Sequence, residues 1–465
     1  MDLTNPLILI PALLVTATLY YALPESRRRP YLLLLSLAFL ASITPQATFL
    51  LLAISLINYA AGLLLERNPE KIALRTLFIL LNGMVWVLPR LFNLVDFSGL
   101  PFNASYLIPV GIAFITLQNT GYLIDVSRGI LPAEHNLINY LLYVTFFAKL
   151  SAGPIEPARR FLPQLKQSYP YQAENIRRGL FLISMGIFKK IVIADRLALI
   201  NDLVFNHPGQ YYGLTVITTL IFYSFQIYFD FSGYSDMARG LAAVFGYDLS
   251  VNFERPFLAE NINEFWSRWH MTLTAWLREY IFFPVRRFFL RQHNSISAFL
   301  ALLVPPLLTM LVSGLWHGLK PTFIIWGIYH GVLLFLNAMQ SRAKKNNLKG
   351  SLWGRRLGTF GLVTFGWFFF RAASLADVGI LLQSIFVKST TYHDLLLTID
   401  AYDLKIAFIA IALVMGFEIY LQDARKTWHD LPVALRWSAW LVILLAISML
   451  GVYQTSNTEF IYAGF

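Results

Sequence analysis

Uninterrupted apolar stretches limit this chain to a small set of folds. Residues 31–65 form a run of 35 without a charged side chain. As one helix, rising about 1.5 Å per residue, this run would extend about 52 Å, whereas the hydrocarbon core of a bilayer is about 30 Å thick. It must therefore fold back, and Pro45 is the expected break. Because hydrophobic residues make up 57% of the chain and charged residues only 14%, the sequence predicts an all-α polytopic membrane protein.

Further apolar stretches are candidates for membrane spans. Several are short for a complete crossing, so we expect about eleven transmembrane helices together with re-entrant or interfacial helices. No long polar linker divides the chain, which predicts one membrane domain over residues 1–465. The candidates are residues 7–23, 77–95, 106–124, 137–150, 211–229, 297–316, 323–336, 357–370, 406–421 and 433–451.

The positive charge of the chain is concentrated in short segments. Lys and Arg outnumber Asp and Glu by 37 to 26, with clusters at residues 25–30, 189–190 and 342–356. By the positive-inside rule these segments are expected to be loops facing the cytoplasm, which places the N-terminus outside. Topology and attraction to anionic lipid explain the basic balance better than nucleic-acid binding does.

The chain contains no cysteine. This excludes disulfides, thiolate metal sites and a cysteine-bound acyl intermediate. Glycine patterns typical of phosphate loops and dinucleotide sites are also absent. We therefore expect no metal and no tightly bound cofactor.

Ionisable residues inside apolar sequence are costly and often mark function. One such segment, residues 146–165, carries Glu156, Arg159 and Arg160 after Gly153-Pro154. A proline-terminated helix end with interfacial arginines and a substrate contact are equally good interpretations.

A second segment, residues 226–249, places Asp230 and Asp236 among aromatic residues. Such acids require hydrogen bonds or a cationic partner. Gly233, with serines on both sides, predicts a broken helix or turn, so structural capping by the aspartates is favoured over catalysis.

A third segment, residues 261–287, has aromatic and leucine side chains at helical spacing. It predicts an aromatic-rich helix at the membrane interface. His270 shares a stripe with Trp266 and Leu273 rather than with the arginines, so it is expected to face an apolar region or a cavity.

The fourth segment, residues 313–331, reads "SGLWHGLKPTFIIWGIYHG" and contains His317 and His330. On one straight helix these histidines would lie about 20 Å apart along the axis and about 220° apart around it. Pro321 between them predicts the start of a new helix. His317 should then end a long span, with Gly314 and Gly318 allowing close approach of other backbone.

Taken together, these segments resemble the membrane-bound O-acyltransferases (MBOAT), in the bacterial branch of alginate O-acetyltransferase and the teichoic-acid D-alanyl transfer protein. The resemblance rests on eight blocks in the expected order, which span most of the chain. They are "PVGIAFITLQNTGYLIDVSRG" (109–129), "AGPI" (152–155), "YFDFSGYSDMARGL" (228–241), "EFWSRWHMTLTAWLREYIFFPV" (264–285), "GLWHG" (314–318), "WGIYHG" (326–331), "GWFFFRA" (366–372) and "FIYAGF" (460–465).

The resemblance implies a ring of helices around a tunnel in the bacterial cytoplasmic membrane. It implies that an acyl thioester, acetyl-CoA or an acyl-carrier protein, arrives from the cytoplasm. The acceptor on the outer side would be a polysaccharide hydroxyl or an acyl-relay protein. His317 corresponds to the catalytic histidine of the family and His270 to its second site histidine, whereas no catalytic role carries over to His330. Trp269, Trp316, Arg268 and Asp236 are further candidates for substrate binding.

Histidine suits this reaction because a sugar hydroxyl is too weak an acid to ionise near neutral pH, whereas a thioester is already activated. His317 would accept the hydroxyl proton, and His270 or Trp269 would donate hydrogen bonds to the substrate or the oxyanion. The resemblance makes acetyl transfer to an extracytoplasmic polysaccharide the favoured function. D-alanyl transfer to teichoic acid is the alternative within the family, and a polysaccharide exporter or lipid flippase is the alternative outside it.

Overall fold

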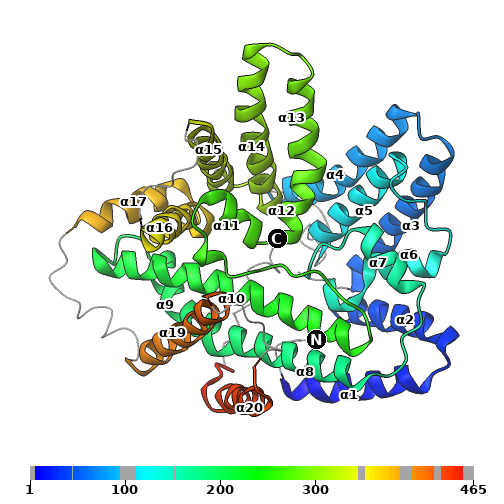
Figure 1. Ribbon diagram of the computed structural model, residues 1–465, viewed down its shortest axis with the longest axis horizontal. Helices are drawn as coiled ribbons and strands as arrows, with labels where there is room; N and C mark the ends of the chain where they lie inside the picture. The colour runs from blue at the N-terminus through cyan, green and yellow to red at the C-terminus, as the bar shows by residue number, and fades with distance from the viewer. Residues whose placement is uncertain are drawn as a thin grey trace, which may run out of the picture. The chain divides into compact units, whose positions relative to one another are not determined.

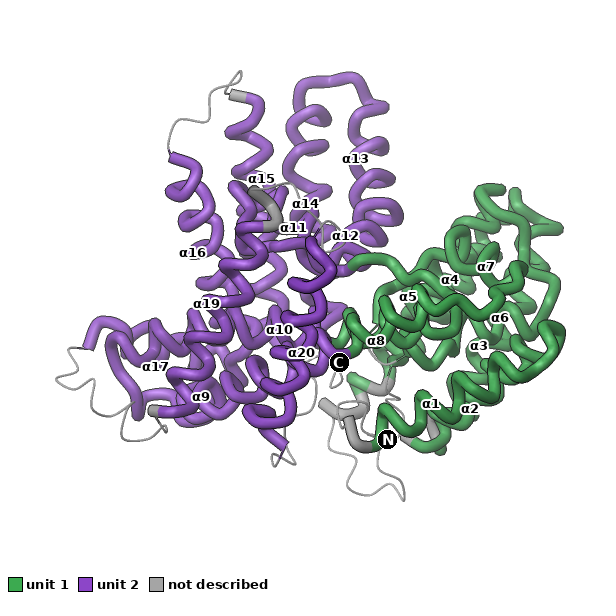
Figure 2. Tube along the Cα trace, turned by 60° about the horizontal axis from the view of Figure 1, so that its bottom comes forward, with its two compact units in different colours: residues 1–183, 234–251, 459–465 green, residues 184–233, 252–458 purple. Residues whose placement is uncertain are grey.

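The computed structural model describes residues 6–43, 45–94, 111–150, 153–343, 351–387, 401–423 and 431–453. Within these ranges the chain is helical and has no β-strand. It divides into two compact units, coloured separately in Figure 2. Unit 1 comprises residues 1–183, 234–251 and 459–465, and unit 2 comprises residues 184–233 and 252–458.

Unit 1 is built mainly from the first eight helices, labelled in Figure 1. They are α1 (Pro6–Ala22), α2 (Glu25–Ile43), α3 (Pro45–Arg67), α4 (Ile72–Leu94), α5 (Ile112–Ser127), α6 (Leu137–Thr145), α7 (Ala158–Leu165) and α8 (Ala173–Ile187), with a 3₁₀ turn at Phe147–Lys149.

Unit 2 contains most of the remaining helices, and the long α10 contributes to both units. They are a π-helical segment (Phe188–Ala194), α9 (Asp195–Asn206), α10 (Leu214–Val244), a 3₁₀ turn (Pro256–Leu258), α11 (Ile262–Arg268), α12 (Met271–Leu277), a second π-helical segment (Arg278–Phe282), α13 (Phe283–Leu290), α14 (Ser295–His317), α15 (Pro321–Ala343), α16 (Leu352–Arg371), α17 (Leu375–Phe386), α19 (Ala401–Asp423) and α20 (Val433–Leu450).

The long apolar run breaks where the sequence predicts it. Helix α2 ends at Ile43 and α3 begins at Pro45, because proline has no N–H to continue a preceding helix but fits the first helical turn. Among the described residues, five helical segments are long and apolar enough to cross a membrane: Thr48–Arg67, Leu214–Val244, Ser295–His317, Pro321–Arg342 and Val433–Leu450. Four shorter apolar helices accompany them, and the expected total of about eleven crossings stays a prediction.

The turn expected around Gly233 does not occur. Helix α10 continues from Leu214 to Val244 without interruption. A Cβ atom at Gly233 would lie 2.8 Å from the carbonyl oxygen of Gly186 in α8. Glycine is therefore required here for close helix packing rather than for a turn.

The lysine pair at residues 189–190 is not in a cytoplasmic loop. Lys190 lies in the first π-helical segment of unit 2 and is only 2% exposed. Its Nζ atom is 2.8 Å from Asp195 and 2.7 Å from Asp230. The prediction that Asp230 needs a cationic partner is thus confirmed, and that partner is Lys190.

Glu156 in unit 1 is fully buried and accepts hydrogen bonds from the backbone N–H and hydroxyl of Ser250. Arg160 pairs with Asp248 at 2.8 Å. These contacts give residues 146–165 a structural role. This role and a substrate contact were the two interpretations that the sequence left open.

Candidate functional site

The segment carrying His270 is not one helix. Helix α11 ends at Arg268, α12 begins at Met271, and His270 between them adopts the left-handed backbone conformation, with φ of 42°. A non-glycine residue in this region is uncommon and is frequently associated with function. The break turns the imidazole inward, so that His270 is 1% exposed and its ring packs edge-on against Phe231 at 4.6 Å between ring centroids.

Asn252 fixes the tautomer of His270. The Asn252 Oδ1 atom accepts hydrogen bonds from the backbone N–H and hydroxyl of Thr272, at 3.2 and 3.0 Å. The same oxygen lies 3.2 Å from His270 Nδ1, which must therefore be the donor. Burial, and to a smaller extent the neighbouring His317, lowers the pKa of His270 well below its ordinary value. The neutral ring consequently carries its proton on Nδ1 and its lone pair on Nε2.

This tautomer limits what His270 can do. A neutral imidazole protonated on Nδ1 accepts a hydrogen bond at Nε2 and does not donate one there. Hydrogen bonding to an oxyanion, as expected from the sequence, would require the imidazolium form that burial disfavours. Sequence reasoning missed Asn252 because an amide 18 residues before a histidine has no recognisable spacing.

His317 is the last residue of α14, as predicted, and is 4% exposed. Its ring centroid lies 4.9 Å from Trp316, 5.3 Å from Trp326 and 4.9 Å from Phe370. Trp316 also contacts His270, with 6.0 Å between ring centroids, so one indole contacts both histidines. The two histidine blocks, 47 residues apart in the sequence, thus meet in one buried, aromatic site within unit 2.

Glycines hold α14 and α15 together beside this site. A Cβ atom at Gly314 would collide with the carbonyl oxygen of Phe323, and one at Gly327 would lie 2.5 Å from that of Met310. At Gly331 it would lie 2.9 Å from the Cα atom of Leu307. The helices α14 and α15, which pack against each other (Figure 1), can approach this closely only without side chains at these positions.

His330 lies nearer the site than its sequence position indicates. Helix α15 begins at Pro321, as predicted, and turns back along α14. The His330 ring is fully buried and lies 5.0 Å from Trp326, the residue that also contacts His317. The predicted helix break at Pro321 therefore brings both histidine rings to one tryptophan, Trp326, although they come from different helices.

The other candidate residues fall into different surroundings. Trp269 is 1% exposed and packs against Phe253, Phe265 and Trp367. Arg268 pairs with Glu264 at 2.5 Å.

Asp236 belongs to unit 1, where it pairs with Arg239 at 3.5 Å. Its role in substrate binding, like those of Arg268 and Trp269, stays a prediction. In the described part of the chain, no group of three or more His, Asp or Glu side chains is placed to hold a metal ion.

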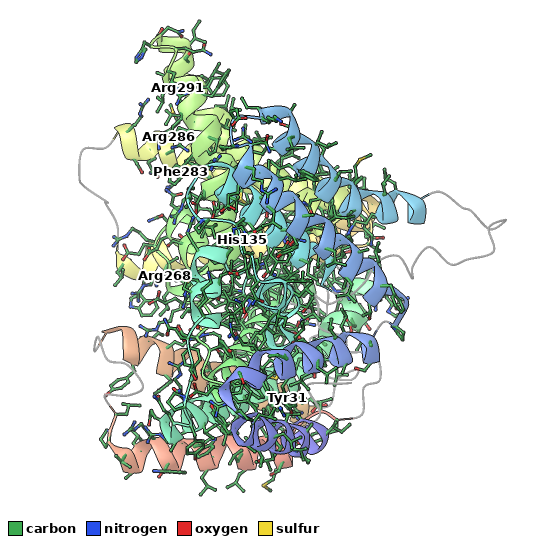
Figure 3. All side chains as sticks on the ribbon, turned by 90° about the vertical axis from the view of Figure 1, so that its right-hand side faces the viewer. Tyr31, His135, Arg268, Phe283, Arg286 and Arg291 are labelled. Atoms are coloured by element: carbon green, nitrogen blue, oxygen red, sulfur yellow. The ribbon has the colours of Figure 1, made fainter. Side chains whose placement is uncertain are left out.

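A cavity of about 700 Å³ opens in unit 2 beside the histidines. Its wall includes Ser313, one helical turn before His317 on α14, and Trp266, whose ring contacts both Trp326 and His330. Arg278, Arg286 and Arg342 also line it, and Figure 3 labels Arg286 on α13. The volume is in the range of small-molecule sites.

A helical membrane protein with two buried histidines beside a cavity has the components of a membrane-embedded enzyme. The model of the membrane-bound O-acyltransferase family matches residues 35–376. A probable alginate O-acetylase AlgI of Pseudomonas aeruginosa is 31% identical over 415 residues, covering 86% of this chain and 78% of the relative. The chain belongs to the membrane-bound O-acyltransferase family and is an acyltransferase.

Two further relatives show the range of the family. A peptidoglycan O-acetyltransferase of Helicobacter pylori is 28% identical over 99% of this chain and 97% of its own length. A teichoic acid D-alanyltransferase of Bacillus subtilis is 30% identical over 56% of this chain and 68% of its own length.

Proposed function

We propose that this acyltransferase moves an acetyl group from a cytoplasmic thioester donor to hydroxyls of an extracytoplasmic polysaccharide, with His317 as the general base. The observation that carries the proposal is the convergence of His317 and His270 on Trp316 in a site enclosed by aromatic rings. The proposal places the protein in the bacterial cytoplasmic membrane, with several crossings and its N-terminus outside.

The reaction needs no covalent enzyme intermediate. The hydroxyl oxygen attacks the thioester carbonyl, a C–O bond forms and the C–S bond breaks. The proton passes from the hydroxyl to His317 and then to the departing thiolate, so the products are an ester and a thiol. Because His317 lies among aromatic side chains, water is excluded and hydrolysis of the thioester is suppressed.

His270 takes the complementary role in this scheme. Its Nε2 lone pair, set by the bond to Asn252, accepts a hydrogen bond from a hydroxyl of the acceptor substrate and orients the attacking oxygen.

The relatives support two candidate reactions. The alginate O-acetylases and the peptidoglycan O-acetyltransferase favour acetyl transfer to a polysaccharide, directly or through a relay protein outside the membrane. The relation to teichoic acid D-alanyltransferases supports D-alanyl transfer from a carrier protein as the second candidate. Assays of the purified protein with acetyl and D-alanyl thioesters separate the two.

Histidine variants test the assignment of the base. We expect His317→Ala to reduce turnover by a factor of roughly 10² to 10⁴, the loss typical of a general base. His207→Ala, at an exposed histidine, is the matched control and should have normal turnover. His330→Ala should reduce activity by letting Trp326 shift, whereas His330→Phe, which keeps a ring there, should be mild. Near-normal transfer by a monodisperse His317→Ala protein would refute the proposed base.

A further inference from the structure

An acidic side chain lies inside the apolar helix α19 of unit 2. Glu418 is the only charged residue of this helix between Lys405 and Asp423. A charged group at membrane depth is costly and is kept where it has a partner or a function. One partner is in α10, 190 residues earlier, where the Tyr228 hydroxyl donates a 2.7 Å hydrogen bond to Glu418 Oε1. This bond joins α19 to α10, two helices of unit 2 that are labelled in Figure 1.

The ring of Tyr228 contacts two residues that are chain neighbours of the Asn252–His270 pair. Its centroid lies 5.9 Å from that of Phe253 and 6.1 Å from that of Trp269. Phe253 follows Asn252 in the chain, and Trp269 precedes His270. The two segments also bond through their backbones, because the N–H of the residue after His270 donates to the carbonyl oxygen of Asn252 at 2.9 Å. Tyr228 therefore packs against both segments at the point where they hold His270.

Position 228 requires a hydrogen bond and not only an aromatic ring. Phe225, Phe229 and Phe231 on the same helix also pack among aromatic rings, but they carry no hydroxyl. Tyr228 is only 2% exposed, and a buried tyrosine hydroxyl needs a partner because burying a polar group without one is costly. The bond to Glu418 meets this need and restricts the movement of the ring.

We infer that Glu418 is a positioning residue for His270, acting through Tyr228. The contact that it protects tolerates little movement. His270 Nδ1 and Asn252 Oδ1 are 3.2 Å apart, at the long end of the usual range of about 2.7–3.2 Å. A small shift of either segment would therefore break this hydrogen bond and release the imidazole ring. The inference rests on the proposed function, in which His270 orients the attacking hydroxyl, and it adds a residue outside the site that maintains this orientation.

Replacing Glu418 should slow the transfer without weakening donor binding. We expect Glu418→Leu to lower kcat by roughly tenfold to a hundredfold, the loss typical of a displaced positioning group, with KM for the donor within about twofold of wild type. Tyr228→Phe removes only the hydroxyl and should give a similar loss. Glu418→Gln keeps an oxygen that can accept the hydrogen bond, so it should restore kcat. The donor is acetyl-CoA, or an acetylated carrier protein if the wild type uses only that.

Tyr223→Phe is the matched control for the loss of a tyrosine hydroxyl. Tyr223 is also a buried residue of α10, but its ring packs against Phe205 of α9. Its kcat should equal that of the wild type. All variants are compared at equal levels of monodisperse protein.

A double-mutant cycle separates this role from general stabilisation of the fold. If Glu418 acts through His270, Glu418→Leu should cause no further loss of kcat in an Asn252→Leu protein, in which the histidine has already lost its partner. A residue that only stabilises the fold would lower kcat by the same factor with and without Asn252. If the Glu418→Leu protein does not fold, Tyr228→Phe replaces it in the cycle.

The possible failures are distinguishable. The inference is wrong, and the proposed function stands, if Tyr228→Phe has a normal kcat, if Glu418→Gln is as impaired as Glu418→Leu, or if the losses in the cycle multiply. If the wild type transfers from no thioester, the proposed function itself is wrong.

Discussion

Asn252 shows how an unreactive side chain can determine the chemistry of a reactive one. Its Oδ1 atom is anchored by two donors of Thr272, so only the Nδ1–H tautomer of His270 satisfies all three groups. The pairing of a histidine with a polar group that orients it is general among enzymes with activated nucleophiles. Here it gives His270 a lone pair on the side of the ring away from Asn252.

Replacing Asn252 should change the pH dependence of the enzyme. Asn252→Asp keeps an acceptor at Nδ1 but adds a negative charge, which raises the pKa of His270 from its lowered value. Protonation then removes the Nε2 lone pair at a higher pH, so the acidic limb of the kcat/KM profile should shift to higher pH by about one unit or more. Asn252→Leu should instead reduce the rate at all pH values. The measurement is the profile from pH 5 to 9, and an unshifted limb in the Asp variant would exclude this role.

For single residues, motif and composition were enough to predict the two histidines of the candidate site. His270 and His317 stand out because titratable groups are rare in apolar sequence. Asn252 could not be identified in this way, because its importance depends on which neighbours share its hydrogen bonds.

Three glycines allow α14 and α15 to pack in close contact. Gly314, Gly327 and Gly331 each face backbone of the opposite helix. This contact brings Trp326 of α15 against His317 of α14. Helix packing and the geometry of the site are therefore coupled.

A methyl group in this contact should impair both stability and activity. Gly327→Ala places a Cβ atom 2.5 Å from the Met310 carbonyl oxygen, and overpacking of this kind costs about 1–3 kcal/mol. Gly361→Ala in α16 is the matched control, since it has open space at its Cβ position. Thermal unfolding in detergent should show a lower Tm for Gly327→Ala only, together with reduced turnover. Equal Tm values for the two variants would contradict the packing argument.

Helix boundaries were predictable where proline sets them, and not where packing does. Pro45 and Pro321 begin helices as expected, because the reason is local. Gly233 was expected to break α10, but the helix continues through it. A glycine is needed there because the carbonyl oxygen of Gly186, distant in the sequence, lies where a side chain would begin. The break at His270 has no local signal, because the residue that contacts its ring, Asn252, lies 18 residues earlier in the chain.

For the whole molecule, the basic segments predict the orientation in the membrane. We expect residues 25–30 and 342–356 to face the cytoplasm and the N-terminus to face outward; residues 344–350 of the second cluster lie outside the described part of the structure. Because the chain has no cysteine, Glu25→Cys, Trp353→Cys and Thr4→Cys each give a single labelling site. A membrane-impermeant maleimide added to intact cells should label only the Thr4 variant. Labelling of either of the other two would reverse the proposed orientation.

Direct transfer makes a second prediction at this scale. Incubation of the purified protein with a radiolabelled thioester and no acceptor should leave no covalently bound acyl group, because the chain has no cysteine and the activated hydroxyl attacks the donor directly. Protein precipitated under denaturing conditions is counted, with His317→Ala as the control. Stable label on a serine or another residue would replace this mechanism by a two-step one.

The buried ion cluster of unit 2 also has a consequence for how the chain is made. During synthesis Lys190 is delivered to the membrane well before Asp230, and a charge inside a bilayer costs at least a few kcal/mol. Asp195, only five residues after Lys190, already provides an opposite charge at 2.8 Å. The segment that emerges first from the ribosome thus carries its own counter-ion, and α10 brings Asp230 to a cation that is already in place.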